Sequence, residues 1–170
     1  SAHMAFSKGY LSQDLKRAYA LSAGKQGGVK AAILCVLQPG TQAVIVLRFG
    51  QWSQSKPLFL RLFLDPVYHL LYLMIRIFWG IEIPKNTRVG PGLYIGHFGG
   101  ITVSSGTVIG KDCNLSQGIT IGVSGEGNKR GIPVIGDDVY IAPGARIFGK
   151  INAGNNVKIG ANAVIHKDIS

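Results

Sequence analysis

A period of six residues governs the sequence from Ile83 to Ser170. Read in sixes, it runs IPKNTR, VGPGLY and onward, and an aliphatic residue, or once Ala153, opens each hexad. Thirteen hexads follow with two interruptions, an expansion by two residues within 95–102 and the segment GNKRGIPV at 127–134. Helices and hairpin strands have periods of about 3.6 and about two, so neither produces this pattern. A short fixed period is typical of a parallel β-helix.

Each hexad is expected to form one short strand and one corner. Three hexads then make a coil of about 18 residues, and the first side chain of each hexad points inward and stacks on its counterpart in the next coil. Glycine or alanine beside the corners permits tight turns with positive φ. We therefore predict a β-helical domain over residues 81–170, with a polar, glycine-rich loop protruding at 123–134.

Residues 1–80 have a different character. SAHM at 1–4 is interpreted as a cloning remnant that ends at the native start, which leaves residues 5–80 as an α-helical N-terminal region. Two or three short helices are expected before residue 57, separated at Gly27-Gly28 and at Pro39-Gly40. Ser12 with Asp14 is expected to begin the first of them.

The segment 57–80, PLFLRLFLDPVYHLLYLMIRIFWG, is the most apolar in the chain. Arg61, Asp65 and Arg76 interrupt it, so no charge-free run approaches the roughly 18 residues of a membrane span. It predicts a helix kinked or restarted at Pro66 and buried against its own domain or neighbouring subunits. Peripheral contact with a membrane is the alternative.

The net charge of +10 is uneven. Residues 1–80 carry nine Lys and Arg against Asp14 and Asp65, a balance of +7 beside the apolar segment. This distribution supports the membrane alternative, with the protein at the inner membrane face. A nucleic-acid partner is not expected, because no aromatic and basic platform accompanies the charge.

Cys35 and Cys113 lie in unlike segments without metal-ligand spacing and are interpreted as buried thiols in a reducing compartment. No cleavable signal peptide is recognised, which indicates a cytoplasmic location. His69, His97 and His166 are too scattered to converge on zinc, so no metal is expected.

Four stretches carry a resemblance to a known family: FWGIEI, IGHFGGITV, LSQGITIGVSG, and IGDDVYIAPGARIFGKINAGNNVKIGANAVIHKDI. The chain resembles the serine acetyltransferase group of left-handed β-helix acyltransferases. Within it, the pattern is most similar to short O-acetyltransferases of exopolysaccharide loci, such as the colanic acid type. The resemblance implies a left-handed β-helix, a homotrimer, acetyl-CoA as donor and an active site between neighbouring subunits.

His97 is the candidate general base. As the third residue of its hexad it is expected to point outward, which also suits a plain surface histidine. Acetyl transfer to a hydroxyl needs a base, and the ordinary imidazole pKa of about 6.5 suits that role. The resemblance implies that His97 is catalytic and that Glu82 orients it, where serine acetyltransferases carry Asp. Glu82 is otherwise a simple surface charge.

Acceptor contacts are expected from Gln117, Phe98 and Arg130. Gln117 lies one expanded coil beyond His97 and should stack over it, whereas Phe98 offers an apolar ring face. Donor contacts are expected from small residues along an extended pantetheine arm and from cations near its phosphates. These are Gly122, Ala142, Gly160, Arg146 and Lys158.

Two departures from the resemblance concern the acceptor. Serine acetyltransferases carry a carboxylate where this chain has Gly96, and an Arg-His pair where it has Gly131-Ile132. Since serine needs partners for its ammonium and carboxylate, a sugar hydroxyl in surface polysaccharide biosynthesis is the expected acceptor. Serine, as in cysteine biosynthesis, is the alternative. A catalytically silent trimeric scaffold is the non-enzyme alternative.

Overall fold

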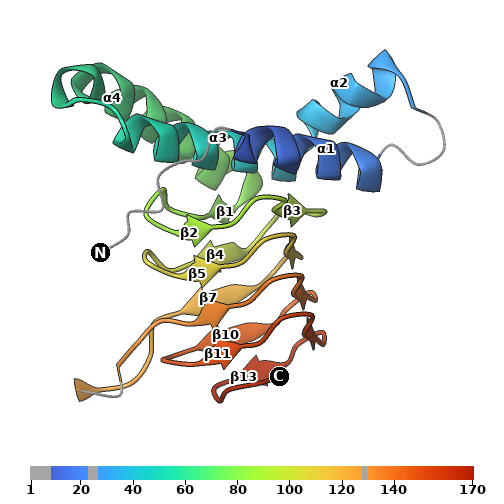
Figure 1. Cartoon of the computed structure of the whole chain (residues 1–170), viewed down its shortest axis with the longest axis vertical. Helices are drawn as coiled ribbons and strands as arrows, with labels where there is room; N and C mark the ends of the chain where they lie inside the picture. The colour runs from blue at the N-terminus through green and yellow to red at the C-terminus, as the bar shows by residue number, and fades with distance from the viewer. Residues whose placement is uncertain (1–8, 23–26, 128–129) are drawn as a thin grey trace.

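The computed structural model describes residues 9–22, 27–127 and 130–170, so the predicted remnant at 1–4 lies outside the described residues. A helical region caps one end of a column of short strands (Figure 1). Its helices are α1 (Tyr10–Ser22), α2 (Val29–Leu37), α3 (Pro39–Gln54), α4 (Leu58–Met74) and the π-helix η1 (Ile75–Trp79). The strands are β1 (Ile81–Glu82), β2 (Arg88–Val89), β3 (Tyr94–Ile95), β4 (Ile101–Val103), β5 (Val108–Ile109), β6 (Asn114–Leu115), β7 (Thr120–Gly122), β8 (Val134–Ile135), β9 (Tyr140–Ile141), β10 (Arg146–Phe148), β11 (Asn152–Ala153), β12 (Lys158–Ile159) and β13 (Val164–Ile165).

The strands form three parallel sheets that the chain visits in rotation. Sheet A has the order β1-β4-β7-β10-β13, sheet B β2-β5-β8-β11, and sheet C β3-β6-β9-β12. In the regular coils, Arg146 pairs with Val164 and Tyr140 with Lys158, each pair 18 residues apart. The predicted parallel β-helix is confirmed, with each hexad forming one strand and one corner.

The core of the column consists of the residues that open the hexads and those two positions before each opener. Ile101, Ile121, Ile141 and Ile147 are completely buried. Cys113 is completely buried and Cys35 nearly so, and both are free thiols as predicted. Burial raises the pKa of the Cys113 thiol above its ordinary value.

The corners depend on left-handed backbone, as predicted, but glycine supplies only part of it. Gly100, Gly118 and Gly144 succeed one another along one edge with φ between 65° and 77°. Along another edge the same role falls to Asp112, Asp138 and Asn156, with φ between 53° and 62°. Asp and Asn tolerate this conformation because their short side chains hydrogen-bond locally.

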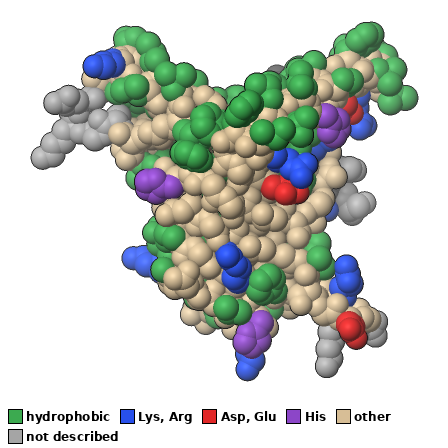
Figure 2. All heavy atoms as spheres, turned by 180° about the vertical axis from the view of Figure 1, so that it is seen from behind, with side chains coloured by type: hydrophobic (Ala, Val, Ile, Leu, Met, Phe, Trp, Pro, Cys, Tyr) green, Lys and Arg blue, Asp and Glu red, His purple; other side chains and the backbone are tan. Residues whose placement is uncertain are grey.

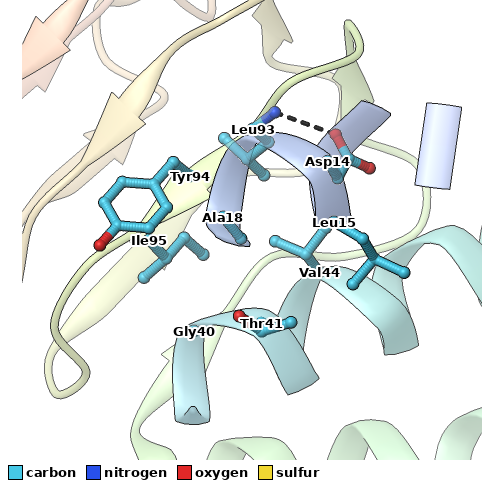
Figure 3. A pocket seen from close by; sticks show the side chains of 9 residues that line it. All are labelled: Asp14, Leu15, Ala18, Gly40, Thr41, Val44, Leu93, Tyr94 and Ile95. Atoms are coloured by element: carbon cyan, nitrogen blue, oxygen red, sulfur yellow. Dashed lines mark hydrogen bonds between the residues drawn. The ribbon is translucent and has the colours of Figure 1, made fainter. Parts of the chain in front are cut away.

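Helices α1 to α3 occupy the expected region and are separated near Gly28 and Pro39. The predicted start at Ser12 and Asp14 is wrong, because α1 begins at Tyr10 and Asp14 lies inside it, 1% exposed. Asp14 Oδ1 accepts hydrogen bonds from the backbone N–H groups of Gly92 (2.7 Å) and Leu93 (3.0 Å). Figure 3 shows the hydrogen bond from Leu93 to Asp14 beside a pocket where α1, α3 and β3 meet.

The apolar segment forms α4 and η1, but its predicted burial within its own domain is wrong. The helix continues through Pro66 without restarting, and only Tyr68 in α4 and Ile75 in η1 are buried. Leu58–Trp79 is the one described helix long and apolar enough to cross a membrane, and 11% of its most apolar stretch lies inside the protein. One side packs on α3, and nothing in the described chain covers the rest.

Candidate active site

His97 lies on the expanded corner between β3 and β4. Ile95 pairs with Leu115 and Thr102 with Thr120, so residues 96–100 occupy the corner that residues 116–118 occupy one coil later. The two additional residues in this corner place the imidazole on the outside of the column, and His97 is exposed as predicted. Its side chain makes no hydrogen bond or ion pair with another described residue. The ring is therefore open to an external ligand.

An aromatic contact and two glycines hold this corner in place. The rings of Phe98 and Trp79 meet edge to face with centroids 5.3 Å apart, and Trp79 Nε1 donates to Gln42 Oε1 at 2.9 Å. Gly99 and Gly100 have φ of 99° and 65°, which disfavours other residues. A Cβ on Gly100 would lie 3.3 Å from the Gly118 Cα. The corner is thus tied to both the helical region and the next coil.

Glu82 lies on β1, whose neighbour β4 follows the His97 corner. Glu82 pairs with Thr102 in the sheet, and the Ile101 N–H donates to the Gly80 carbonyl at 3.0 Å. The Glu82 carboxylate, however, pairs with Arg76, with Oε2 3.8 Å from Nη2. The expected contact between Glu82 and His97 is therefore not formed in the described chain. Since the pair with Arg76 is about half exposed, it is weak and easily exchanged.

Gln117 lies at the place in the next coil that corresponds to His97. The pairing of Ile95 with Leu115 and the 2.8 Å hydrogen bond from Gly118 N to Gly99 O fix this register. The Gln117 side chain is partly buried, and its Oε1 has no hydrogen-bond partner among the described residues. A polar atom left without a partner here is available to a ligand after a small side-chain movement.

Ala142 and Gly160 lie along the same edge as His97. Ile141 pairs with Ile159, and the Ala142 N–H donates to the Ile159 carbonyl at 3.0 Å, which places the two small residues in one column. Ala142 is 6% exposed, whereas a Cβ on Gly160 would meet nothing within 4 Å. Of these two residues, Gly160 is open to a donor within one chain, whereas Ala142 is covered by its own coils.

The other predicted ligand contacts do not all lie at the His97 edge. Gly122 ends β7 at the corner between sheets A and B, away from the corner between C and A that holds His97. Arg146 Nη1 donates to the Gly118 carbonyl, so this guanidinium is already engaged, whereas Lys158 is exposed on β12. Arg130 is exposed on the loop after β7, which a bridge between Ser124 and Gly131 closes. One chain does not bring Arg130 to His97.

Sequence reasoning missed two residues near the site, Trp79 and Arg76. Their signal was the FWG stretch at the end of the apolar segment, but its contact with Phe98 depends on the tertiary fold. No group of three His, Cys, Asp or Glu within the described ranges is arranged to hold a metal ion.

No protein-family model matches the sequence. A serine acetyltransferase of Helicobacter pylori strain 26695 is 31% identical over 134 residues, which cover 79% of this chain and 75% of that protein. The chain belongs to the serine acetyltransferase family. A second family member, from Synechococcus elongatus, is 31% identical over 137 residues, 81% of this chain and 53% of that protein. This serine acetyltransferase family chain thus spans about half of one relative and three quarters of the other.

The fold comparison agrees. The crystal structure of Neisseria gonorrhoeae serine acetyltransferase in complex with serine superposes with a TM-score of 0.70 and 27% identity, covering 94% of this chain and 63% of that one. This confirms the fold class of the serine acetyltransferase family, a left-handed parallel β-helix with a small helical region before it. The expected closeness to exopolysaccharide O-acetyltransferases receives no support from these relatives.

Proposed function

We propose that the protein is an acetyl-CoA-dependent O-acetyltransferase with His97 as its general base. The observation that carries the proposal is the exposed, unengaged imidazole on the expanded corner of a serine acetyltransferase family chain. Phe98, held by Trp79, and the glycines beside it fix the backbone on which the imidazole stands. A base fixed on a rigid corner suits transfer between two bound substrates.

The chemistry requires one proton to move twice. An imidazole nitrogen of His97 accepts the proton of the acceptor hydroxyl while that oxygen attacks the carbonyl carbon of the thioester. The carbon–sulfur bond then breaks, and the departing CoA sulfur takes the proton from the imidazolium. In this proposal Glu82 exchanges Arg76 for His97 when substrates bind, which selects the imidazole tautomer and stabilises its cation.

The active unit is proposed to be a homotrimer. The loop that carries Arg130 leaves the column between sheets A and B, whereas His97 lies between sheets C and A. A neighbour packed beside the column would bring its loop, and with it Arg130 and Gly122, to the His97 edge. Gly160 and Lys158 are the proposed donor contacts on the same chain as His97.

Serine is the acceptor that the relatives favour, because they are named serine acetyltransferases. A sugar hydroxyl is the second candidate, and two positions favour it. A Cβ on Gly131 would lie 2.4 Å from the Lys150 Cβ, so this position has no room for the Arg of the family pattern unless Lys150 moves. Gly96 likewise provides no charge next to His97, and a neutral sugar needs none.

The experiment is a CoA-release assay on the full chain with L-serine and a panel of glycan acceptors. His97→Asn is expected to lower kcat by about 10²–10⁴, the range for a general base. His166→Asn is the matched control, because His166 is also exposed but lies near the far end of the column. Retained turnover in the His97 variant excludes the proposed base. If none of the acceptors is acetylated and calorimetry detects no CoA binding, the protein is instead a catalytically silent scaffold.

A further inference from the structure

The polarity of α4 and η1 is inverted relative to that of a helix on a protein surface. Toward the protein, Asp65 Oδ1 accepts a hydrogen bond from Lys85 Nζ at 2.9 Å, and the Tyr68 hydroxyl accepts one from the Lys85 N–H at 3.0 Å. Toward solvent lies an apolar face whose members are all at least 47% exposed: Leu58, Phe59, Leu62, Phe63, Val67, Leu70, Leu73, Ile77 and Phe78. A surface helix normally buries its apolar side. This face therefore requires an apolar partner outside the chain.

The apolar face is extended and has a counterpart on α2. The 22 residues of α4 and η1 span about 33 Å. On α2, four further large apolar side chains are more than half exposed: Val29, Ile33, Leu34 and Leu37. Figure 2 shows hydrophobic side chains gathered over this helical end of the molecule, which is opposite the end that carries β13 in Figure 1.

The exposed charged side chains on the helices are cationic. The two carboxylates of the helical region are engaged, Asp14 by Arg48 and Asp65 by Lys85. Lys16 on α1 and Lys30 on α2 are exposed, and Arg76 on η1 is exposed in a weak pair with Glu82. Two copies joined through this end would bring like charges together, whereas an anionic lipid surface attracts them. Charge therefore favours a bilayer over a second copy as the partner.

We propose that the apolar face of α4 and η1 docks the protein on an anionic membrane surface. The helix lies in the interface and does not cross it, because its other side carries Asp65, which pairs with Lys85 of the folded domain, and Arg61, which pairs with Asp65 along the helix. Crossing would carry both charged groups into hydrocarbon. The geometry is that of an interfacial helix, with its apolar side among the acyl chains and cations near the headgroups. Through the contact of Trp79 with Phe98, the end of the docked helix lies against the His97 corner.

The test is flotation of the full chain with phosphatidylcholine vesicles and with vesicles containing about one third phosphatidylglycerol. The protein is expected to float with the anionic vesicles, with a partition coefficient at least about tenfold higher than with the neutral ones. Phe63→Gln with Ile77→Gln is expected to lower binding by about tenfold or more, because both side chains leave the apolar face. Val164→Gln is the matched control, since Val164 is 61% exposed on β13 and should leave flotation unchanged.

Light scattering and circular dichroism on the same variants complete the test. Unchanged helicity with lost flotation supports docking. Lys30→Glu leaves the apolar face intact and is expected to lower only the preference for anionic over neutral vesicles. It replaces the double variant in the test if the double variant does not fold. The proposal is overturned if the wild-type protein does not float with anionic vesicles. It is also overturned if the double variant floats normally but forms smaller oligomers, because a second copy then covers the face.

Discussion

The Nε of Arg48 lies 2.8 Å from the Oδ2 of Asp14, and both side chains are 1% exposed. Arg48 also donates to the carbonyls of Val89 at 2.8 Å and Gly90 at 2.6 Å, while Asp14 accepts from the N–H groups of Gly92 and Leu93. One ion pair thereby joins α1, α3 and the first coil of the β-helix. Every charge in it is satisfied, as burial of ions demands.

Asp14→Asn is expected to destabilise the protein by about 3–5 kcal/mol, because it leaves a buried guanidinium without its counter-ion. Asp112→Asn is the matched control, since Asp112 pairs with Arg17 at 3.7 Å but is 51% exposed. That exposed pair should contribute less than about 1 kcal/mol. Denaturant unfolding of both variants makes the comparison. Equal losses would mean that the buried pair has no special role.

Glu82→Gln is expected to lower kcat by about 10²-fold, at the low end of the range for acid–base groups, because Gln cannot stabilise the imidazolium. Arg76→Gln removes only an exposed ion pair, worth under about 1 kcal/mol, and should change kcat by less than about fivefold. Steady-state CoA release measures both. A larger effect of the Arg76 substitution than of the Glu82 substitution would show that Glu82 does not orient His97.

Gly100→Ala is expected to cost about 1–2 kcal/mol, because alanine at φ 65° is strained. The Gly118 Cα, 3.3 Å from the added Cβ, leaves little room to relax. The strain falls on the His97 corner, so kcat should decline along with thermal stability. Gly160→Ala is the stability control, since its Cβ meets open space. A fully stable and active Gly100 variant would show that the corner tolerates other conformations.

The anchoring of α4 is expected to weaken in acid. The hydrogen bond from Lys85 is the main cause that lowers the pKa of Asp65 below its ordinary 3.8, with smaller contributions from Ser53 and Arg61. A carboxyl whose pKa is lower in the folded state stabilises the fold above its unfolded pKa and loses this contribution as pH falls through the folded one. The hydrogen-exchange protection of α4, corrected for the intrinsic exchange rate at each pH, should therefore fall below about pH 4. Asp65→Asn should remove this pH dependence. An unchanged acid response in that variant would mean that another titrating group causes it.

The sequence by itself determined the column, because a six-residue repeat of aliphatic residues has one regular way to bury them: strand by strand around an axis. It also placed His97 outward, since the register of a hexad decides which side chains face the core. The expansion at 95–102 was visible in the same count.

Only the tertiary structure decided what depends on neighbours distant in the chain. The pairing of Glu82 with Arg76 and the contact of Phe98 with Trp79 arise where η1 meets the first coil. The exposure of α4 was equally hidden, because an apolar helix looks the same in sequence whether its own domain or an outside partner covers it. Burial belongs to the assembled surface, and the sequence pattern records only that an apolar partner is needed.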